Sequence, residues 1–248
     1  MGKRSRLLLV TLLCAGVLAC SDQTGADSVT RADAAGQDAY FLWAGVRPPP
    51  ELAHARMVYI LAGEVRAGNG AYIVPLRPQV PQIDHADIWL VIRVETLDWQ
   101  ESTQDQLARM IGQWSAQNRL AGVQIDFDSA TLGLEHYASF LADLRKRLPA
   151  QYQLSITGLM DWSANGERQA LDTLAGTVDE IVIQTYQGRS TIPGFEAYLD
   201  SFVDLPMPYK IGIVQDADWQ VPASVRRDPE YRGNVVFLLN PPGRASAP

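Results

Sequence analysis

The sequence predicts an α/β fold, a (β/α)8 TIM-like barrel whose outer ring of helices is incomplete. Eight short apolar runs recur along the chain, and several are rich in Val and Ile, as strands are. Segments of helical period separate the later runs, and strands that alternate with helices form parallel sheets. The 248 residues are enough for one such barrel. An open doubly wound parallel sheet is the alternative.

The predicted strands are the apolar runs that turn residues bound. They are Tyr40–Ala44, Met57–Leu61, Ile88–Val94, Gly122–Phe127, Gln153–Gly158, Ile181–Tyr186, Lys210–Val214 and Asn234–Leu239. Helices are predicted where apolar residues recur at steps of three and four, over Ser102–Arg119, Leu134–Leu148, Glu167–Leu174 and Phe195–Val203. Residues 63–81 are typical of a Gly/Pro-rich hairpin, and the last unit lacks a clear helix. The helix ring is therefore expected to be incomplete.

The chain begins with a positively charged stretch followed by Leu7–Ala19, an uncharged and mostly apolar run of thirteen residues. That length is too short to cross a bilayer but is typical of a secretory signal. Val17–Cys20 resembles a bacterial lipoprotein signal box, which implies that residues 1–19 are removed and that Cys20 carries lipid such as palmitate. Ser21 replaces the Asp that marks inner-membrane retention, so the resemblance implies the outer membrane, facing the periplasm.

The rest of the chain is expected to form one domain. Residues 20–37 are rich in Ser, Thr, Asp, Gly and Ala without periodicity, and predict a flexible tether. Residues 38–242 form the barrel and residues 243–248 a disordered tail. With 21 Lys and Arg against 28 Asp and Glu, the formal charge is −7, so we expect no nucleic-acid partner. We expect a monomer that meets the membrane through Cys20 and takes a poly- or oligosaccharide.

The stretch Ala121–Asp128 is the most informative for chemistry. Side chains alternate along a strand, so Gln124, Asp126 and Asp128 share one face. The intervening residues are apolar and suit the layer against the helices, so the polar face points into the barrel. Residues two positions apart on a strand have Cα atoms roughly 6.6 Å from each other, and at that range we expect the titrations of two carboxylates to couple. A neutral acid beside an ionised partner is what glycosidic bond cleavage requires. Alternatively, these acids only neutralise Arg93.

Two motifs resemble those of family 18 glycoside hydrolases, the chitinase-like barrels. Gly122–Asp128 resembles the signature of their fourth strand, which implies Asp128 as the general acid and Asp126 as the acid that orients the acetamido group of the substrate. Gln184–Gln187 is similar to the Met-x-Tyr-Asp motif of their sixth strand, which implies that Tyr186 holds the acetamido oxygen. The sequence departs from the pattern in having Asp for Glu at 128, Gln at 124 and 187, and no Trp on the eighth strand.

A resemblance over more of the chain rests on three stretches. Residues 122–128, 154–162 and 178–184 resemble a family of bacterial lipoproteins that is catalogued as domain of unknown function 3142. That family implies no activity by itself.

Other polar and aromatic residues follow the predicted strands and are candidates for binding a sugar. An indole offers a flat apolar face for a sugar ring, and amide, carboxylate and guanidinium groups offer hydrogen bonds. The candidates are Trp43, Arg93, Glu95, Trp99, Gln124, Asp161, Trp162, Gln184 and Trp219. The alternative for the tryptophans is packing at the barrel mouth.

The sequence predicts neither a metal nor a cofactor. The histidines His54, His85 and His136 lack the spacing of metal ligands, and no nucleophile elbow, P-loop or dinucleotide fingerprint occurs. We therefore predict a lipid-anchored glycoside-hydrolase-like protein that acts on an envelope or extracellular polysaccharide. A non-catalytic glycan-binding or envelope-assembly lipoprotein on the same barrel is the alternative.

Overall fold

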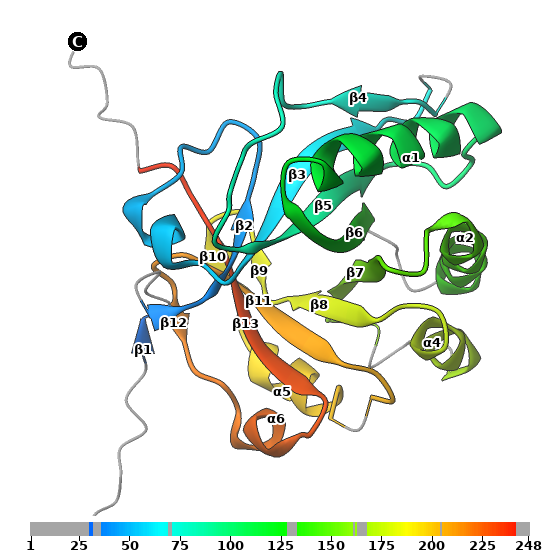
Figure 1. The fold of residues 1–248 in the computed structure, drawn as a ribbon. Helices are drawn as coiled ribbons and strands as arrows, with labels where there is room; N and C mark the ends of the chain where they lie inside the picture. Colours follow the sequence, from blue (N-terminus) through cyan, green and yellow to red (C-terminus); the bar gives the residue numbers. More distant parts are fainter. Residues whose placement is uncertain are drawn as a thin grey trace, which may run out of the picture.

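The protein is a closed barrel of parallel strands, seen in a computed structural model that describes residues 30–31, 36–68, 71–127, 133–160, 162, 168–203 and 205–241 (Figure 1). In these ranges eight strands form the ring: β2 (Ala39–Leu42), β3 (Met57–Val65), β5 (Asp87–Val94), β6 (Arg119–Phe127), β7 (Gln153–Leu159), β8 (Glu180–Gln184), β11 (Tyr209–Val214) and β13 (Tyr231–Phe237). Strand β2 pairs with both β13 and β3, which closes the sheet. The predicted barrel is confirmed, and the open sheet is excluded.

Helices cover the barrel on one side and below in Figure 1. They are α1 (Glu101–Ser115), α2 (Leu134–Arg147), α4 (Arg168–Ala175), α5 (Phe195–Asp200) and the five-residue α6 (Ala223–Arg227), which the sequence analysis did not predict. A 3-10 turn, η2 (Pro50–His54), joins β2 to β3, and β4 (Ile73–Pro75) pairs with β3 as the expected hairpin. The helix ring is therefore incomplete, as predicted. None of the described helices combines the length and the apolar character needed to cross a membrane.

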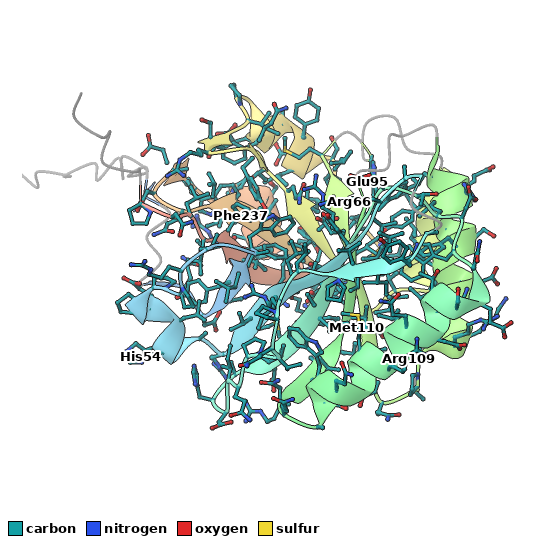
Figure 2. All side chains as sticks on the ribbon, turned by 90° about the horizontal axis from the view of Figure 1, so that it is seen from above. His54, Arg66, Glu95, Arg109, Met110 and Phe237 are labelled. Atoms are coloured by element: carbon teal, nitrogen blue, oxygen red, sulfur yellow. The ribbon has the colours of Figure 1, made fainter. Side chains whose placement is uncertain are left out.

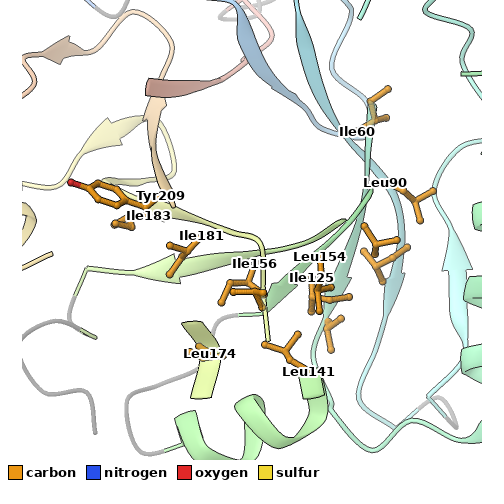
Figure 3. Packing of buried hydrophobic residues seen from close by; sticks show 14 of the residues in the cluster. Ile60, Leu90, Ile125, Leu141, Leu154, Ile156, Leu174, Ile181, Ile183 and Tyr209 are labelled. Atoms are coloured by element: carbon orange, nitrogen blue, oxygen red, sulfur yellow. The ribbon is translucent and has the colours of Figure 1, made fainter. Parts of the chain in front are cut away.

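The helices pack on the outward face of the strands because both elements are amphipathic. On α1, Met110 is buried against the barrel while Arg109 is exposed (Figure 2). Figure 3 shows the strand residues of this core with Leu141 of α2 and Leu174 of α4. The strand residues labelled there are Ile60, Leu90, Ile125, Leu154, Ile156, Ile181, Ile183 and Tyr209. This packing fixes which residues of each strand face the barrel interior.

The interior of the barrel is filled by a second apolar cluster. It consists of Ala39, Phe41, Tyr59, Leu61, Trp89, Val91, Val182 and Val235. Tyr59 and Trp89 stack with ring centroids 5.6 Å apart. Gly122 makes room for Trp89, because a Cβ at this position would lie 2.1 Å from the carbonyl oxygen of Gln153 and 2.8 Å from the indole. The barrel is thus a packed core below its mouth.

Two small sheets lie beside the carboxyl ends of the barrel strands. Strands β9 (Tyr186–Gln187) and β10 (Ser190–Thr191) form a hairpin after β8. Strand β1 (Thr30–Arg31) pairs with β12 (Asp218–Trp219), which follows β11. The tether expected over residues 20–37 is therefore paired with the barrel domain at residues 30–31. Pairing through backbone hydrogen bonds needs no particular side chains, so the composition did not reveal it. The signal segment, Cys20 and the tail 243–248 lie outside the described residues.

Candidate functional site

A cleft of about 780 Å³ opens at the carboxyl ends of the barrel strands. In barrels of this kind the reacting groups lie at this end, on the strand ends and the loops that follow. Five of the residues singled out from the sequence line it: Trp43, Arg93, Asp126, Gln184 and Tyr186. They come from β2, β5, β6, β8 and β9 or from the residues directly after them, so the closed ring brings together positions up to 143 residues apart.

Asp126 lies at the floor of this cleft. The predicted alternation on its strand is confirmed, because Val123 and Ile125 are in the core against the helices while Asp126 lines the cleft. Only 6% of Asp126 is exposed, and its Oδ1 accepts a hydrogen bond from Thr157 Oγ1 of the next strand at 2.8 Å. Asp128 lies outside the described residues, so its pairing with Asp126 stays a prediction.

Gln124, which was predicted to bind substrate, lies too deep to do so. Its side chain is fully buried in the barrel interior and does not line the cleft. Its Nε2 donates a hydrogen bond to Ser155 Oγ at 2.9 Å, and Ser155 Oγ in turn donates to Glu180 Oε1 at 3.3 Å. Asp126 lies two positions further along the strand than Gln124, and this difference in depth decides which of the two reaches the cleft.

A buried ion pair in the barrel interior was missed by the sequence analysis. Lys210 of β11 pairs with Glu180 of β8, and each side chain is only 10% exposed. Tyr59 donates a hydrogen bond to Glu180 Oε1 and accepts one of 3.0 Å from Lys210 Nζ. Burial and the negative charge of Glu180 raise the pKa of Tyr59 well above its ordinary value. Glu180 directly precedes the predicted strand Ile181–Tyr186, and Lys210 begins the next predicted strand, so opposite charges at the starts of two consecutive strands were the signal that could have revealed this pair.

Three aromatic rings form one wall of the cleft. The ring of Phe237, the last residue of β13, lies 5.4 Å from Trp43 and 5.1 Å from Tyr186 between centroids. Arg77 supports this wall from behind, because its guanidinium donates hydrogen bonds to the carbonyl oxygens of Leu42 at 2.9 Å and Trp43 at 3.2 Å. Such a wall offers flat apolar surface at small entropic cost.

Arg93 stands beside Asp126 without forming an ion pair with it. The two residues are partners in the pairing of β5 with β6. The Arg93 guanidinium instead lies 5.9 Å from the centroid of Trp43, and no salt bridge of Arg93 occurs among the described residues. The alternative in which Arg93 merely neutralises the acids is therefore unsupported for Asp126. Glu95 is exposed outside the cleft, where Oε2 accepts a hydrogen bond from the backbone of Ala67 at 3.1 Å.

The other three tryptophans that the sequence analysis named as candidates do not line the cleft. Trp162 is fully buried and packs edge-on against Tyr137, and Trp219 is 5% exposed and stacks on Phe195 at 4.8 Å. Both indoles are buried, so neither can bind a sugar in the cleft, and the packing alternative describes them. Trp99 is partly buried against Phe140 of α2. Residues after a strand end no longer follow its alternation, so a loop can turn them back onto the helix layer. Asp161 lies outside the described residues.

Several lining residues were missed. Met160 follows β7, and Ile192 and Tyr198 come from the connection and helix after β10. Phe237 could have been found, because it has the same parity as the buried Val235 on the predicted last strand. The segment around Ile192 carries no pattern that would place it over the cleft.

The chemistry of the site rests on few polar groups. Among the described residues of the lining, Asp126 is the carboxylate, and Tyr186, Gln184 and Gln187 offer hydrogen bonds. Behind Asp126, burial and the nearby carboxylate raise the pKa of Tyr137 well above its ordinary value, so this phenol stays protonated. No group of three or more His, Cys, Asp or Glu suited to a metal ion occurs in the described part of the chain. The arrangement suits binding of a polar ring and proton transfer by carboxylates.

Comparison with known families supports the resemblance found in the sequence. Residues 78–195 match the model of the family described as Domain of unknown function (DUF3142). This DUF3142 match runs from the segment before β5 to the first residue of α5, so it includes Arg93, Asp126 and Tyr186. No curated protein sequence matches the chain.

Three solved structures have a similar barrel. The Bacillus cereus spore cortex-lytic enzyme SleL matches with 18% identity and a TM-score of 0.50, over 75% of this chain and 52% of SleL. The xylanase and alpha-amylase inhibitor protein XAIP-II from Scadoxus multiflorus matches with 10% identity and a TM-score of 0.53, over 81% and 93% of the two chains. The class V chitinase from Nicotiana tobaccum matches with 11% identity and a TM-score of 0.50, over 71% of this chain and 66% of the chitinase chain. This chain thus spans about half the length of SleL, and it shares the barrel fold of these three structures.

Proposed function

We propose that this DUF3142-like protein is a glycoside-hydrolase-like protein that takes a poly- or oligosaccharide into the cleft at the barrel mouth. One observation carries the proposal: Asp126 lies at the floor of a cleft whose wall is formed by Trp43, Phe237 and Tyr186. Aromatic rings hold the apolar faces of sugars, and a carboxylate below them is placed for work on the glycosidic bond. The fold shared with SleL and the class V chitinase is consistent with a glycan ligand.

In the proposed reaction, Asp128 donates a proton to the glycosidic oxygen as the bond to the leaving sugar breaks. Asp126 stays ionised and stabilises the positive charge that develops on the sugar ring. Water then adds to the anomeric carbon and gives up a proton, which restores the acid form of Asp128. Tyr186 and Gln184 hydrogen-bond the sugar in this scheme, as their positions in the cleft allow. Support comes from the inward orientation of Asp126 on β6, the strand that Asp128 directly follows by sequence.

The test is a screen of amino-sugar and other polysaccharides with the wild type and with Asp128→Asn and Asp126→Asn. We expect product from the wild type and a loss of rate of about 100-fold or more in each variant, the size of a general acid–base contribution. Glu95→Gln is the matched control, because it removes an exposed carboxylate outside the cleft. No product from the wild type, or equal product from Asp128→Asn, would contradict hydrolysis.

A non-catalytic glycan-binding protein is the second candidate. The cleft carries the amide Gln187 where the hydrolase motif has Asp, which favours binding without turnover. If the protein only binds glycans, calorimetry should show saturable binding of an oligosaccharide, and no product should form. A titration without affinity for any envelope or extracellular glycan would remove both candidates and leave an envelope-assembly role.

For the location, we propose lipid on Cys20 and attachment to the outer membrane, facing the periplasm. Ten Cα–Cα steps separate Cys20 from Thr30, which pairs with β12 beside the carboxyl end of β11. These steps reach at most about 36 Å, so the lipid would hold the cleft near the membrane surface. Cys20→Ser should abolish labelling with palmitate and release the protein from the membrane fraction. Unchanged labelling and retention would contradict the anchor.

A further inference from the structure

The cleft contains a cation, Arg93, that forms no ion pair with any of the described residues. Among the described lining residues, Arg93 has the positive charge and Asp126 the negative charge. Arg93 is exposed and forms no salt bridge with any described residue. Its guanidinium lies over the ring of Trp43, 5.9 Å from the centroid. A guanidinium held on an aromatic face keeps its N–H groups available at the edge.

The neighbouring carboxylate is held in another direction. The strand order is β2, β3, β5, β6, β7, so Arg93 on β5 lies over Trp43 toward β2, whereas Asp126 is bonded to Thr157 toward β7. The two side chains thus diverge although their backbones are paired. A ligand on the Trp43 side of the cleft therefore contacts the Arg93 guanidinium, while the hydrogen bond to Thr157 holds the Asp126 carboxylate on the other side.

The charge of the whole protein excludes a general attraction for anions. The formal net charge is −7, so an acidic polymer is repelled at long range. Any preference of the cleft for an anionic ligand must then come from a local contact. Arg93 offers one, because guanidinium and carboxylate form two parallel hydrogen bonds with matching geometry.

We infer that the cleft selects an acidic saccharide and that Arg93 binds a carboxylate carried by a sugar ring. This inference rests on the proposed function, since it names the class of glycan that the same cleft takes. The ring would pack on the wall of Trp43 and Phe237 while its carboxylate pairs with Arg93. Uronic acids and the lactyl ether of muramic acid both present such a carboxylate.

The test compares each acidic ligand with its neutral counterpart at pH 7 in titration calorimetry. One arm uses oligosaccharides that contain uronic acid and the same oligosaccharides after carboxyl reduction. The other arm has as its acidic ligand an oligosaccharide in which N-acetylglucosamine alternates with muramic acid. Its neutral counterpart is an oligomer of N-acetylglucosamine of equal length. Wild type, Arg93→Gln, Arg93→Lys and the control Arg109→Gln are measured. Arg109 is exposed on α1, away from the cleft residue Phe237 (Figure 2).

We expect the wild type to bind an acidic ligand of at least one arm about tenfold or more tightly than its neutral partner, the strength of a charge-assisted hydrogen bond. The ratio of the affinity for the acidic ligand to that for the neutral ligand should fall to about one in Arg93→Gln and fall partly in Arg93→Lys. It should stay unchanged in Arg109→Gln and should decrease as salt is added. Equal binding of acidic and neutral ligands, or an unchanged ratio in Arg93→Gln, overturns the inference but not the proposed function. Absence of binding to every saccharide overturns both. A thermal melt of each variant shows whether the substitution has unfolded the protein.

Discussion

Thr157 on β7 donates a hydrogen bond from Oγ1 to Oδ1 of Asp126 on β6 at 2.8 Å. Both residues lie inside paired strands of the barrel, and both are less than a tenth exposed. The carboxylate at the cleft floor is therefore oriented by the sheet and not by a loop. A carboxylate held in this way is pre-organised for a ligand.

Thr157→Val should destabilise the protein by about 1.5–3 kcal/mol, because it removes a hydrogen bond from a buried carboxylate with little change in shape. Denaturant unfolding at pH 7 measures this change. In the Asp126→Asn background the same substitution should cost less, since the acceptor is no longer charged. Thr177→Val, which removes an exposed hydroxyl bonded to the carbonyl oxygen of Thr173, is the control. Equal losses in the two Thr variants would contradict the special role of Thr157.

Trp43→Ala and Trp162→Ala should fail in different ways. Trp43 lines the cleft, so its truncation should weaken saccharide binding about tenfold or more with a small loss of stability. Trp162 is fully buried, so its truncation should lower the free energy of unfolding by about 3–5 kcal/mol. Binding isotherms and thermal melts of both variants separate the effects. If the two variants were equally stable and lost saccharide binding to the same degree, the assignment of Trp43 to binding and Trp162 to stability would be wrong.

The Lys210–Glu180 pair should stabilise the barrel only as a pair. Lys210→Met leaves the buried Glu180 without its cation and should cost about 3–5 kcal/mol in the free energy of unfolding. Adding Glu180→Gln removes the second charge and should recover at least half of that loss. The control is Lys146→Met in the exposed pair with Asp143, which should leave stability nearly unchanged. If the double variant Lys210→Met with Glu180→Gln were no more stable than Lys210→Met alone, the unpaired charge of Glu180 would not be the cause of the lost stability.

Stability should fall above pH 10 because of buried tyrosines. The pKa of Tyr137 is raised in the folded state, first by burial and then by Asp126, above its ordinary value of 10.0. A tyrosine that binds its proton more tightly in the folded protein than in the unfolded chain contributes its full stabilisation of the folded state at any pH below its pKa in the unfolded chain. This stabilisation is lost as the pH rises beyond that value. In Tyr137→Phe the fall should be shallower, whereas Tyr72→Phe, at a side chain that is 50% exposed, should keep the slope of the wild type. Parallel curves for all three proteins would contradict this account.

The eight strands and the inward face of β6 could be predicted because they depend on local patterns. An apolar run bounded by turn residues identifies a strand wherever it pairs, and alternation places Asp126 opposite Val123 and Ile125 without knowledge of the neighbours. The same reasoning failed for Trp162 and Trp219. Both lie at or beyond strand ends, where the backbone no longer alternates and the contacts of the loop decide burial.

By itself, the sequence of this protein determined a barrel of parallel strands with an incomplete helix ring and an acidic residue facing its interior. Only the tertiary structure decided that Trp43 meets Phe237, that Glu180 meets Lys210, and that Arg93 turns from Asp126. The physical reason is that strand pairing brings together residues that are far apart in the sequence. β2 pairs with β13 where the ring closes, and β8 pairs with β11 elsewhere in the ring. Contacts between residues on different strands leave no periodic trace in either segment.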